Sequence, residues 1–379
     1  MAWVKVRTTS DGIKRYIACY RDPEGRQRSA GTFSSNRAAE RAANREEQRV
    51  LAGSWRDHSL GEVRFREYVE TEWLPSKHIE PTTKAAYQSN LDRHFFPFLG
   101  RKQLHQITPG LVQDWVTKAA AGGLSARSIR KYHTMLHSIF VRAVRDKLIV
   151  ANPCEHTELP KVITTKTPTL TPDEFDALLA AIPDRYRLMV ETAIETGMRW
   201  GELIALKPRH VDFLRRTITV ADTIMEVSKR HSPTGKRYVA KPYPKDNEPR
   251  TFGVSQDWLD QVAEHIKTQD LGRDDLLFAT SAGTPISRNT FRTRVWQPAV
   301  KASGVSFNVR MHDLRHAHAS WLLAGGSDLA SVMERLGHAH IQTTEKYLHA
   351  PADADQKNLT ALDRIRNGTP APPPEPTGE

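Results

Sequence analysis

The pattern of hydrophobic and polar positions divides the chain into three structured segments and a tail. In the first segment, short alternating stretches are interrupted by turn residues at positions 10–12 and 23–25. Three strands are therefore expected at residues 2–8, 13–22 and 26–33. A helix is expected from Ser35 or Asn36 to Gly53. This segment is predicted to form a small sheet with one helix.

The second segment, residues 60–155, has the spacing of amphipathic helices. Three helices are expected. The first begins after Pro81, with Thr82 or Thr83 as its cap, and ends at Gly100; the others lie at residues 108–123 and 125–149. The last carries an apolar stripe at helical spacing, formed by Ile129, Leu136, Ile139, Phe140 and Val144. A compact helical bundle is predicted. The proline-containing stretch 152–170 that follows lacks periodicity and predicts a domain boundary.

The third segment opens on a helix-start signal, in which Thr171 caps, Pro172 occupies the first helical position and Glu174 completes a capping box. Helices are expected to follow as far as Leu206. Short strands are expected within residues 215–227, 236–241 and 250–255, and more helices from Asn289 to Tyr347. In the tail, Leu359, Leu362 and Ile365 share one helical face, and the proline-rich end is expected to be disordered.

The predicted fold class is therefore α+β and mainly α. It comprises a sheet-plus-helix domain (1–55), a helical domain (60–155), a mixed and mostly helical domain with a small antiparallel sheet (165–367) and a disordered tail (368–379).

Charge changes this picture by indicating a partner. The 379-residue chain has 55 Lys and Arg against 44 Asp and Glu, a net charge of +11, which favours a polyanion such as nucleic acid. A short basic sheet fits the DNA major groove. The candidate DNA-binding residues are Arg15, Arg21, Arg26 and Arg28 in the first segment and Arg127, Arg130 and Lys131 in the second. The alternative is that these are ordinary solvated surfaces.

The two cysteines, Cys19 and Cys154, are far apart in sequence and predict neither a disulfide framework nor a cysteine-based zinc site. Residues 1–16 lack the apolar core of a signal peptide, and no stretch is long and apolar enough to span a membrane. A cytoplasmic, reducing location is expected.

Four stretches carry candidate chemistry: "ETGMRWGELIAL" (195–206), "KPYPKDNEPRTFGV" (241–254), "MHDLRHAHAS" (311–320) and "LGHAHIQTTEKYLH" (336–349). Arginine is a permanently charged fork that matches two phosphate oxygens, and tyrosine can attack phosphorus to form a covalent phosphotyrosine. A histidine can accept the tyrosine proton, and a lysine can protonate the leaving 5′ oxygen. With arginines supplying the charge, no metal or other cofactor is needed.

These stretches resemble the motif boxes of the tyrosine recombinases, the family of the phage-type integrases. The resemblance implies that Arg199 and Arg315 clamp the phosphate, that His312 accepts a proton and that His338 donates a hydrogen bond to the phosphate. It makes Tyr347 the nucleophile of a 3′-phosphotyrosyl intermediate, with Lys245 as general acid; Lys241, four residues away, is the alternative. Glu202 is expected to support Arg199, and His340 stands where the family often has serine.

The resemblance further implies an arm-type DNA-binding domain at residues 1–55, a SAM-like core-binding domain at 60–155 and a catalytic domain at 165–367. The expected partners are double-stranded DNA with core-type and arm-type sites, three further copies in a homotetramer on a Holliday junction, an excisionase and a host DNA-bending protein. The expected activity is site-specific integration and excision of a phage or other mobile element, without metal or ATP. The C-terminal apolar face either docks on a neighbouring protomer or packs on its own chain.

Other interpretations of the same residues remain open. The chain could be a related resolvase, a type IB topoisomerase-like enzyme or a DNA-binding regulator without catalysis. The six histidines at 312, 316, 318, 338, 340 and 349 could form a zinc site of a hydrolase, although the usual zinc spacings are missing. His316 and His318 are expected to be packing or surface residues, and Trp200 and Trp321 to lie in the core.

Overall fold

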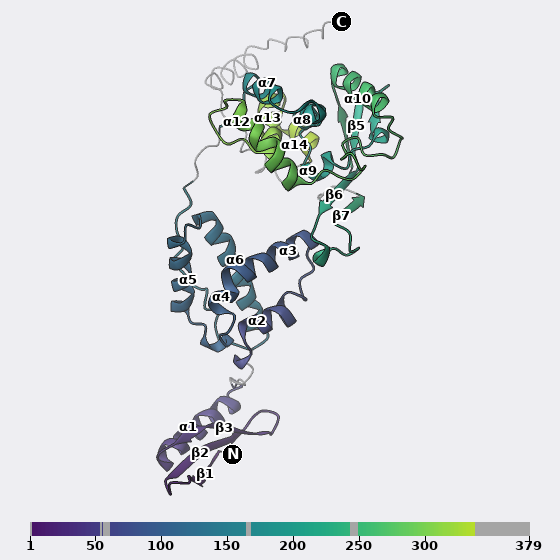
Figure 1. Ribbon diagram of the computed structural model, residues 1–379. Coiled ribbons are helices and arrows are strands. Elements are labelled where there is room, and N and C mark those ends of the chain that lie inside the picture. The colour runs from purple at the N-terminus through teal and green to yellow at the C-terminus, as the bar shows by residue number, and fades with distance from the viewer. Residues whose placement is uncertain (1, 54, 56–60, 164–167, 243–248, 338–379) are drawn as a thin grey trace, which may run out of the picture. The chain divides into compact units, whose positions relative to one another are not determined.

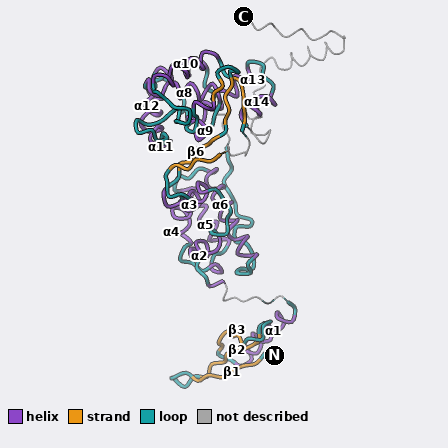
Figure 2. Tube along the Cα trace, turned by 90° about the vertical axis from the view of Figure 1, so that its right-hand side faces the viewer, coloured by secondary structure: helices purple, strands orange, loops and turns teal. Residues whose placement is uncertain are grey.

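The computed structural model describes residues 2–53, 55, 61–163, 168–242 and 249–337. By their internal contacts the residues form two compact units, one from 1–80 with 86–164 and the other from 81–85 with 165 onward. Each unit contains helices and at least one small antiparallel sheet. The expected α+β, mainly helical fold class is therefore confirmed (Figures 1 and 2).

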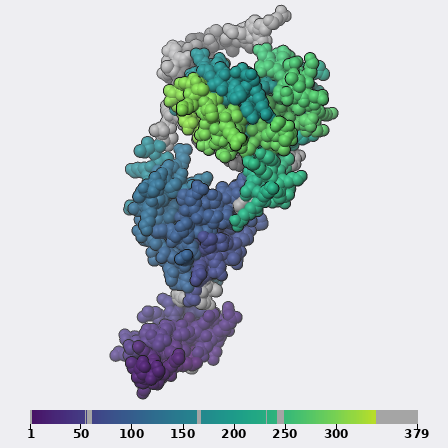
Figure 3. Space-filling model, in the orientation of Figure 1, coloured from purple at the N-terminus to yellow at the C-terminus, as the bar shows by residue number. Residues whose placement is uncertain are grey.

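The N-terminal part is a three-stranded antiparallel sheet covered on one face by a helix (Figures 1 and 2). Its elements are β1 (Trp3–Thr8), β2 (Lys14–Arg21), β3 (Gln27–Phe33) and α1 (Asn36–Leu51). Ala39 and Ala43 of α1 are fully buried against Ala18 of β2, because small side chains allow a helix to lie close to a sheet. Its residues, purple in Figure 3, form a rounded body.

The helical part is organised around a second hydrophobic core. Its helices are α2 (Phe65–Tyr68), α3 (Pro81–Asn90), α4 (Phe96–Leu99), α5 (Pro109–Ala121) and α6 (Ala126–Arg145), with single π-helical turns at Val69–Trp73 and Leu91–Phe95. Trp73, Phe65 and Phe140 are fully buried in it. Helix α3 begins at Pro81, so the cap predicted at Thr82 or Thr83 is wrong. Glu80 precedes the first helical residue, and Pro81 occupies the first helical position.

The C-terminal part holds most of the remaining helices around the largest core. They are α7 (Pro172–Ala180), α8 (Asp184–Thr196), α9 (Trp200–Leu203), α10 (Gln256–Thr268), α11 (Arg288–Phe291), α12 (Gln297–Ala302), α13 (Met311–Ala324) and α14 (Leu329–Leu336). The capping box predicted at Thr171 is present, since Thr171 and Glu174 accept each other's backbone N–H at 3.2 and 2.9 Å. Helix α10 was not expected from the sequence.

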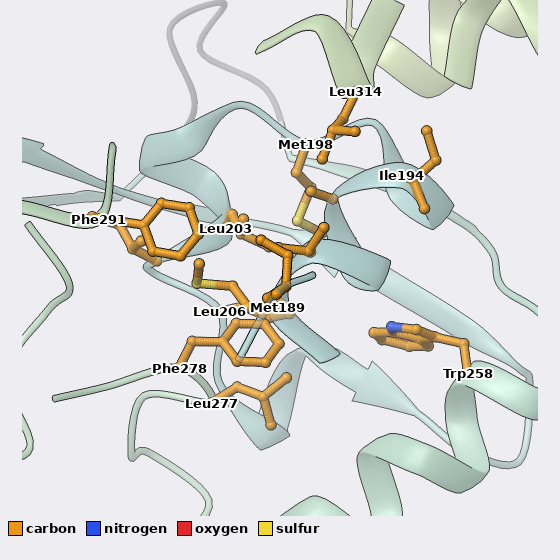
Figure 4. Packing of buried hydrophobic residues seen from close by; sticks show 14 of the residues in the cluster. Met189, Ile194, Met198, Leu203, Leu206, Trp258, Leu277, Phe278, Phe291 and Leu314 are labelled. Atoms are coloured by element: carbon orange, nitrogen blue, oxygen red, sulfur yellow. The ribbon is translucent and has the colours of Figure 1, made fainter. Parts of the chain in front are cut away.

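Two small antiparallel sheets replace the single one expected here. The strands β4 (Val211–Asp212), β5 (Thr217–Val220) and β8 (Arg250–Gly253) form one, and β6 (Asp222–Glu226) pairs with β7 (Tyr238–Pro242) in the other. Residues 215–227 therefore contain two strands of different sheets, with Ala221 between them. Figure 4 shows Leu314 of α13 beside Met198, which brings the start of α13 to the turn between α8 and α9.

The α6 helix offers a direct test of the bundle core, because Phe140 is fully buried while its neighbour Val141 is 49% exposed. Phe140→Ala is expected to lower the free energy of unfolding by about 3–5 kcal/mol, and Val141→Ala to change it by about 0.5 kcal/mol or less. Denaturant unfolding followed by tryptophan fluorescence measures both. Equal losses in the two variants would contradict this packing.

Candidate active site

Arg199 is placed by a glycine turn between two helices. Gly197 ends α8 in the left-handed region (φ 61°), and Arg199 is the residue that caps α9. A β-carbon at Gly197 would lie 2.7 Å from both the His318 ring and the Leu336 side chain. Both the backbone angle and the lack of space therefore require glycine here.

Glu202 holds the Arg199 side chain in place. Its buried carboxylate accepts the Arg199 backbone N–H at 3.0 Å and one guanidinium nitrogen at 3.0 Å. Burial acts to raise the pKa of Glu202, but hydrogen bonds and charge from Arg250 and Arg199 outweigh it and lower that pKa below its ordinary value. Glu202 is therefore a carboxylate at neutral pH, and its expected position beside Arg199 is observed.

Arg315 is 2% exposed, which is rare for a charged side chain. It projects from α13 and donates to the Gly197 carbonyl at 2.7 Å and to the Leu336 carbonyl at 2.5 Å. A buried guanidinium needs such partners because leaving its N–H groups unpaired costs free energy. Arg315 thus joins the α8–α9 turn to the end of α14.

Both arginines meet at two consecutive peptide groups. Arg315 binds the carbonyl of Leu336, and Arg199 binds that of Gly337 at 2.9 Å. Gly337 ends α14 in the left-handed region (φ 64°). These contacts bring together three stretches that are distant in the sequence: 195–206, 311–320 and the start of 336–349. They meet at Leu336 and Gly337, and His338 is the next residue in the chain.

His312 lies in the first turn of α13, which Arg310 and Asp313 stabilise through a capping box. The ring reaches solvent, and that of His316 lies 4.9 Å away. Partial loss of solvation, then the nearby His316 and Arg315, lower the pKa of His312 to about 4. His312 is therefore neutral at physiological pH, the form that can accept a proton.

The other predicted catalytic residues, Lys245, His338 and Tyr347, lie outside the described residues, as do His340 and the C-terminal apolar positions. Lys241 lies in β7, opposite Thr223 of β6. Among the residues that the structure describes, no group of three or more His, Cys, Asp or Glu side chains is arranged to hold a metal ion.

Two arginines that did not stand out in the sequence complete the arrangement. Arg250 of β8 donates to both Glu202 oxygens, at 3.3 and 2.6 Å. Arg335 of α14 donates to the Gly253 and Glu195 carbonyls, at 2.9 and 3.0 Å, with Phe252 beneath it. Neither could be singled out beforehand, because single arginines in a strand or on a helix carry no spacing signal.

His318 is buried, as the packing interpretation predicted, and accepts a hydrogen bond from Arg335 at 3.0 Å through Nε2. Its ring is also hydrogen-bonded to the Ile194 backbone. Burial, then the charges of Arg335 and Arg315, lower the pKa of His318 to about 4. Trp200 and Trp321 are partly buried and pack against the main core, so both lie at its edge.

The candidate DNA-binding residues of the first unit differ in their surroundings. Arg28 is bonded to the buried carboxylate of Asp22 at 2.9 Å, and Arg21 donates to the Gly25 carbonyl at 2.7 Å. Arg26 pairs with the exposed Glu24 at 3.0 Å. Arg28 and Arg21 therefore stabilise the turn between β2 and β3, and this structural role is independent of any contact with DNA.

Arg15 lies on the sheet face opposite to α1, since its neighbours Tyr16 and Ala18 alternate toward the helix. Its cross-strand partner is Arg7, and Lys5 lies on the same face opposite Ile17. Two arginines directly opposite each other repel, which is tolerated where a polyanion binds. Arg7 and Lys5 were not among the predicted DNA-binding residues, because the strand register was not known from the sequence.

On α6, Arg127, Arg130 and Lys131 are exposed at one-turn spacing. Arg130 also donates to the carbonyls of Pro160 and Leu159, at 2.8 and 3.3 Å. It therefore fixes the segment that follows the bundle while its surroundings remain basic.

Comparisons with known proteins agree with this architecture. Residues 168–353 match the model of the phage integrase family, and residues 64–120 match that of the phage integrase N-terminal SAM-like domain. The putative prophage phiRv2 integrase of Mycobacterium tuberculosis (strain H37Rv) is 28% identical over 373 residues, covering 95% of both chains. The tyrosine recombinase XerC of Anoxybacillus flavithermus is 30% identical over 298 residues, 76% of this chain and 92% of the relative.

Solved structures share the fold. The Tn1549 transposon integrase in complex with transposon right end DNA superposes with a TM-score of 0.67 at 18% identity, covering 79% of this chain and 99% of that one. A lambda integrase tetramer bound to a Holliday junction gives 0.57 at 23% identity, with 90% and 94% covered.

Fold and motif residues together define an enzyme class, the DNA recombinases that act through a tyrosine. The chain belongs to the tyrosine recombinase family, also called the phage integrase family, and is a site-specific DNA recombinase. The expectation drawn from the motif boxes is confirmed at this level. Within the described ranges, no helix combines the length and apolar character needed to cross a membrane.

The buried His318 predicts how stability depends on pH. The unfolded chain binds a proton at this histidine with a pKa of about 6.5, whereas the folded pKa is about 4. The neutral His318 side chain therefore contributes fully to the free energy of unfolding above its unfolded pKa. This contribution is lost as the pH falls toward its folded pKa. Acidification from pH 7 to pH 5 is expected to lower the free energy of unfolding by about 2 kcal/mol through this histidine.

Denaturant unfolding of the full chain and of His318→Gln at both pH values measures this contribution. The glutamine has no titrating group but keeps an oxygen that can accept from Arg335. A smaller loss of stability on acidification is expected in the variant. The same loss in both proteins would show that His318 does not carry the dependence.

Proposed function

We propose that this recombinase is an integrase that inserts and excises a phage or other mobile element, with Tyr347 as its nucleophile. The observation that carries the residue roles is the convergence of Arg199 and Arg315 on the carbonyls of Leu336 and Gly337, directly before His338. Residues that hold one phosphate must meet in space, and these two meet at the two residues that precede His338 in the chain.

The proposed reaction has two balanced transesterifications. The Tyr347 hydroxyl oxygen attacks the scissile phosphorus, its proton passes to His312, and the bond from phosphorus to the 5′ oxygen breaks. Lys245, or Lys241 in its place, protonates the leaving 5′ oxygen. The 5′ hydroxyl of the partner strand then attacks the phosphotyrosine and gives its proton to the lysine. The bond from phosphorus to the Tyr347 oxygen breaks, and His312 returns the proton to that oxygen. One phosphoester replaces another at each step, so no external energy source is consumed.

Arg199 and Arg315 supply positive charge where the pentavalent phosphorus accumulates negative charge, and His338 donates a hydrogen bond to it. Because guanidinium groups do not lose their protons at physiological pH, this charge is constant. Glu202 carries one negative charge between Arg199 and Arg250, so the cluster remains net positive. The bonds to backbone carbonyls fix the guanidinium planes before DNA arrives.

The domain roles follow from the same interpretation. We assign arm-type DNA binding to residues 1–55, core-type binding to 60–155 and catalysis to 165–367, with 368–379 as a tail. The Lys5, Arg7 and Arg15 face is the surface we assign to arm-type DNA, and the exposed side of α6 contributes to core-type binding. Arm-type binding favours an integrase over a two-domain resolvase or a topoisomerase-like enzyme.

The proposed assembly is a homotetramer that holds two DNA duplexes and proceeds through a Holliday junction. A lambda integrase tetramer has been seen on such a junction, and its fold is similar to that of this chain. An excisionase and a host DNA-bending protein are proposed as further partners. The reaction is assigned to the cytoplasm of a bacterial host, at the nucleoid, where the substrate DNA lies.

Covalent trapping tests the function. The protein is incubated in EDTA with labelled DNA from the flanks of its own gene, nicked so that the cleaved end diffuses away. A DNA band shifted by one protein mass is expected on a denaturing gel for the wild type and is expected to be absent for Tyr347→Phe. The adduct should form with EDTA present, because arginines carry the phosphate charge.

An adduct with Tyr347→Phe would assign the nucleophile elsewhere. Binding without an adduct at every junction sequence offered would favour a regulator, and an adduct or cleavage that needs added metal would favour a hydrolase. Cleavage of DNA without regard to sequence would favour the topoisomerase-like alternative.

The sheet face makes a separate prediction. Arg7→Gln with Arg15→Gln is expected to weaken arm-site binding and to reduce the slope of log K against log salt by about 1 for each phosphate that is no longer neutralised. Arg37→Gln, exposed on α1, is the control and should leave both unchanged. Fluorescence anisotropy over a salt series measures the two quantities. An equal effect of the control substitution would show that the Lys5, Arg7 and Arg15 face is not the binding surface for arm-type DNA.

A further inference from the structure

Arg250 is the first residue of β8, and its guanidinium meets Glu202 end to end. One terminal nitrogen lies 3.3 Å from Oε1 and the other 2.6 Å from Oε2. The side chains of Arg250 and Glu202 are 10% and 2% exposed. A bidentate pair of this kind fixes both the distance and the plane of the carboxylate, which a single charge does not.

The same carboxylate is the one that holds Arg199. Oε1 accepts from Arg199 at 3.0 Å, and Oε2 accepts from its backbone N–H at 3.0 Å. Glu202 is therefore shared by two arginines, one on each side. Any displacement of the carboxylate on the Arg250 side moves the acceptor on which the Arg199 guanidinium depends.

Arg250 is also anchored at the end of α14. Its Nε donates to the Arg335 carbonyl at 2.9 Å. The Gly337 α-carbon packs against its side chain so closely that a β-carbon there would lie 3.3 Å from the Arg250 Cδ. The Gly337 carbonyl in turn accepts from Arg199. Arg250, Glu202, Arg199 and the end of α14 thus form one closed set of contacts.

We propose that Arg250 is a positioning residue for strand cleavage, which orients Arg199 through the shared Glu202 carboxylate and fixes this pair to the end of α14. The inference rests on the proposed role of Arg199 at the scissile phosphate. Arg250 makes three directed donations, to both Glu202 oxygens and to the Arg335 carbonyl. A lysine at this position keeps the charge but has no planar fork with which to make all three.

The test compares Arg250→Lys with Arg209→Lys in the full chain. Arg209 forms an analogous fork with Asp222 and Asp274 elsewhere in the same unit, so it controls for the loss of any arginine fork. Each substitution is made in the wild type and in Arg199→Ala. Adduct formation on the nicked DNA is measured under single-turnover conditions at saturating protein, with DNA affinity and thermal unfolding in parallel.

Arg250→Lys is expected to slow adduct formation about 10²-fold while DNA affinity stays within about twofold, because Arg250 acts on Arg199 rather than on DNA binding as a whole. In the Arg199→Ala background the same substitution is expected to cost about threefold or less, since the residue it positions is already missing. Arg209→Lys is expected to leave the rate of adduct formation unchanged in both backgrounds.

An equal cost of Arg250→Lys in both backgrounds would overturn the inference, as would an equal slowing by Arg209→Lys or an unchanged rate. Slowing that disappears when the assay is run well below the unfolding temperature of the variant would assign Arg250 to stability alone and would also overturn it. In each case the wild type still forms its adduct through Tyr347. If the wild type forms none, the proposed function itself fails, and the role of Arg250 with it.

Discussion

The site depends on one buried carboxylate between two guanidiniums. Glu202 is 3% exposed and accepts from both Arg199 and Arg250. Burying a carboxylate is unfavourable unless charge and hydrogen bonds compensate, and removing one partner from such a group is strongly destabilising. The short α9 helix, the start of β8 and the end of α14 are all positioned by the partners that this carboxylate requires.

The side chains of α13 to which we assign catalytic roles share their helix with residues of the core. On α13, Leu314 packs beside Met198 in the main core (Figure 4). The next residue, Arg315, donates to the Gly197 and Leu336 carbonyls. His312 lies one turn before Arg315 on the same helix. Packing of the apolar residues thus sets the axial position of α13, and the spacing of the helix places the polar ones. The preorganisation of the site follows from the core.

The sequence predicted those parts of the site that have a local pattern. The Glu202 support of Arg199 and the capping box at Thr171 each depend on two residues three positions apart. Arg250 and Arg335 contribute through contacts 48 and 82 residues away in sequence, to Glu202 and Gly253, which no spacing signals. Helix α10 was missed because its buried apolar positions are few and follow directly after a strand. The basic sheet face formed by Lys5, Arg7 and Arg15 could not be predicted, because it depends on the strand register that places Arg7 opposite Arg15.

The burial of Arg315 has a consequence for how such a chain diverges over time. Its two bonds to backbone carbonyls make it part of the folded framework, so a change there removes stability along with any role at the phosphate. Tyr347 and His338 lie beyond that framework in the sequence. In a lineage that drifts toward binding DNA without cutting it, natural selection for a folded protein retains the arginines. Tyr347, the proposed nucleophile, is then the first to be replaced, and intact arginine boxes alone do not identify an active descendant.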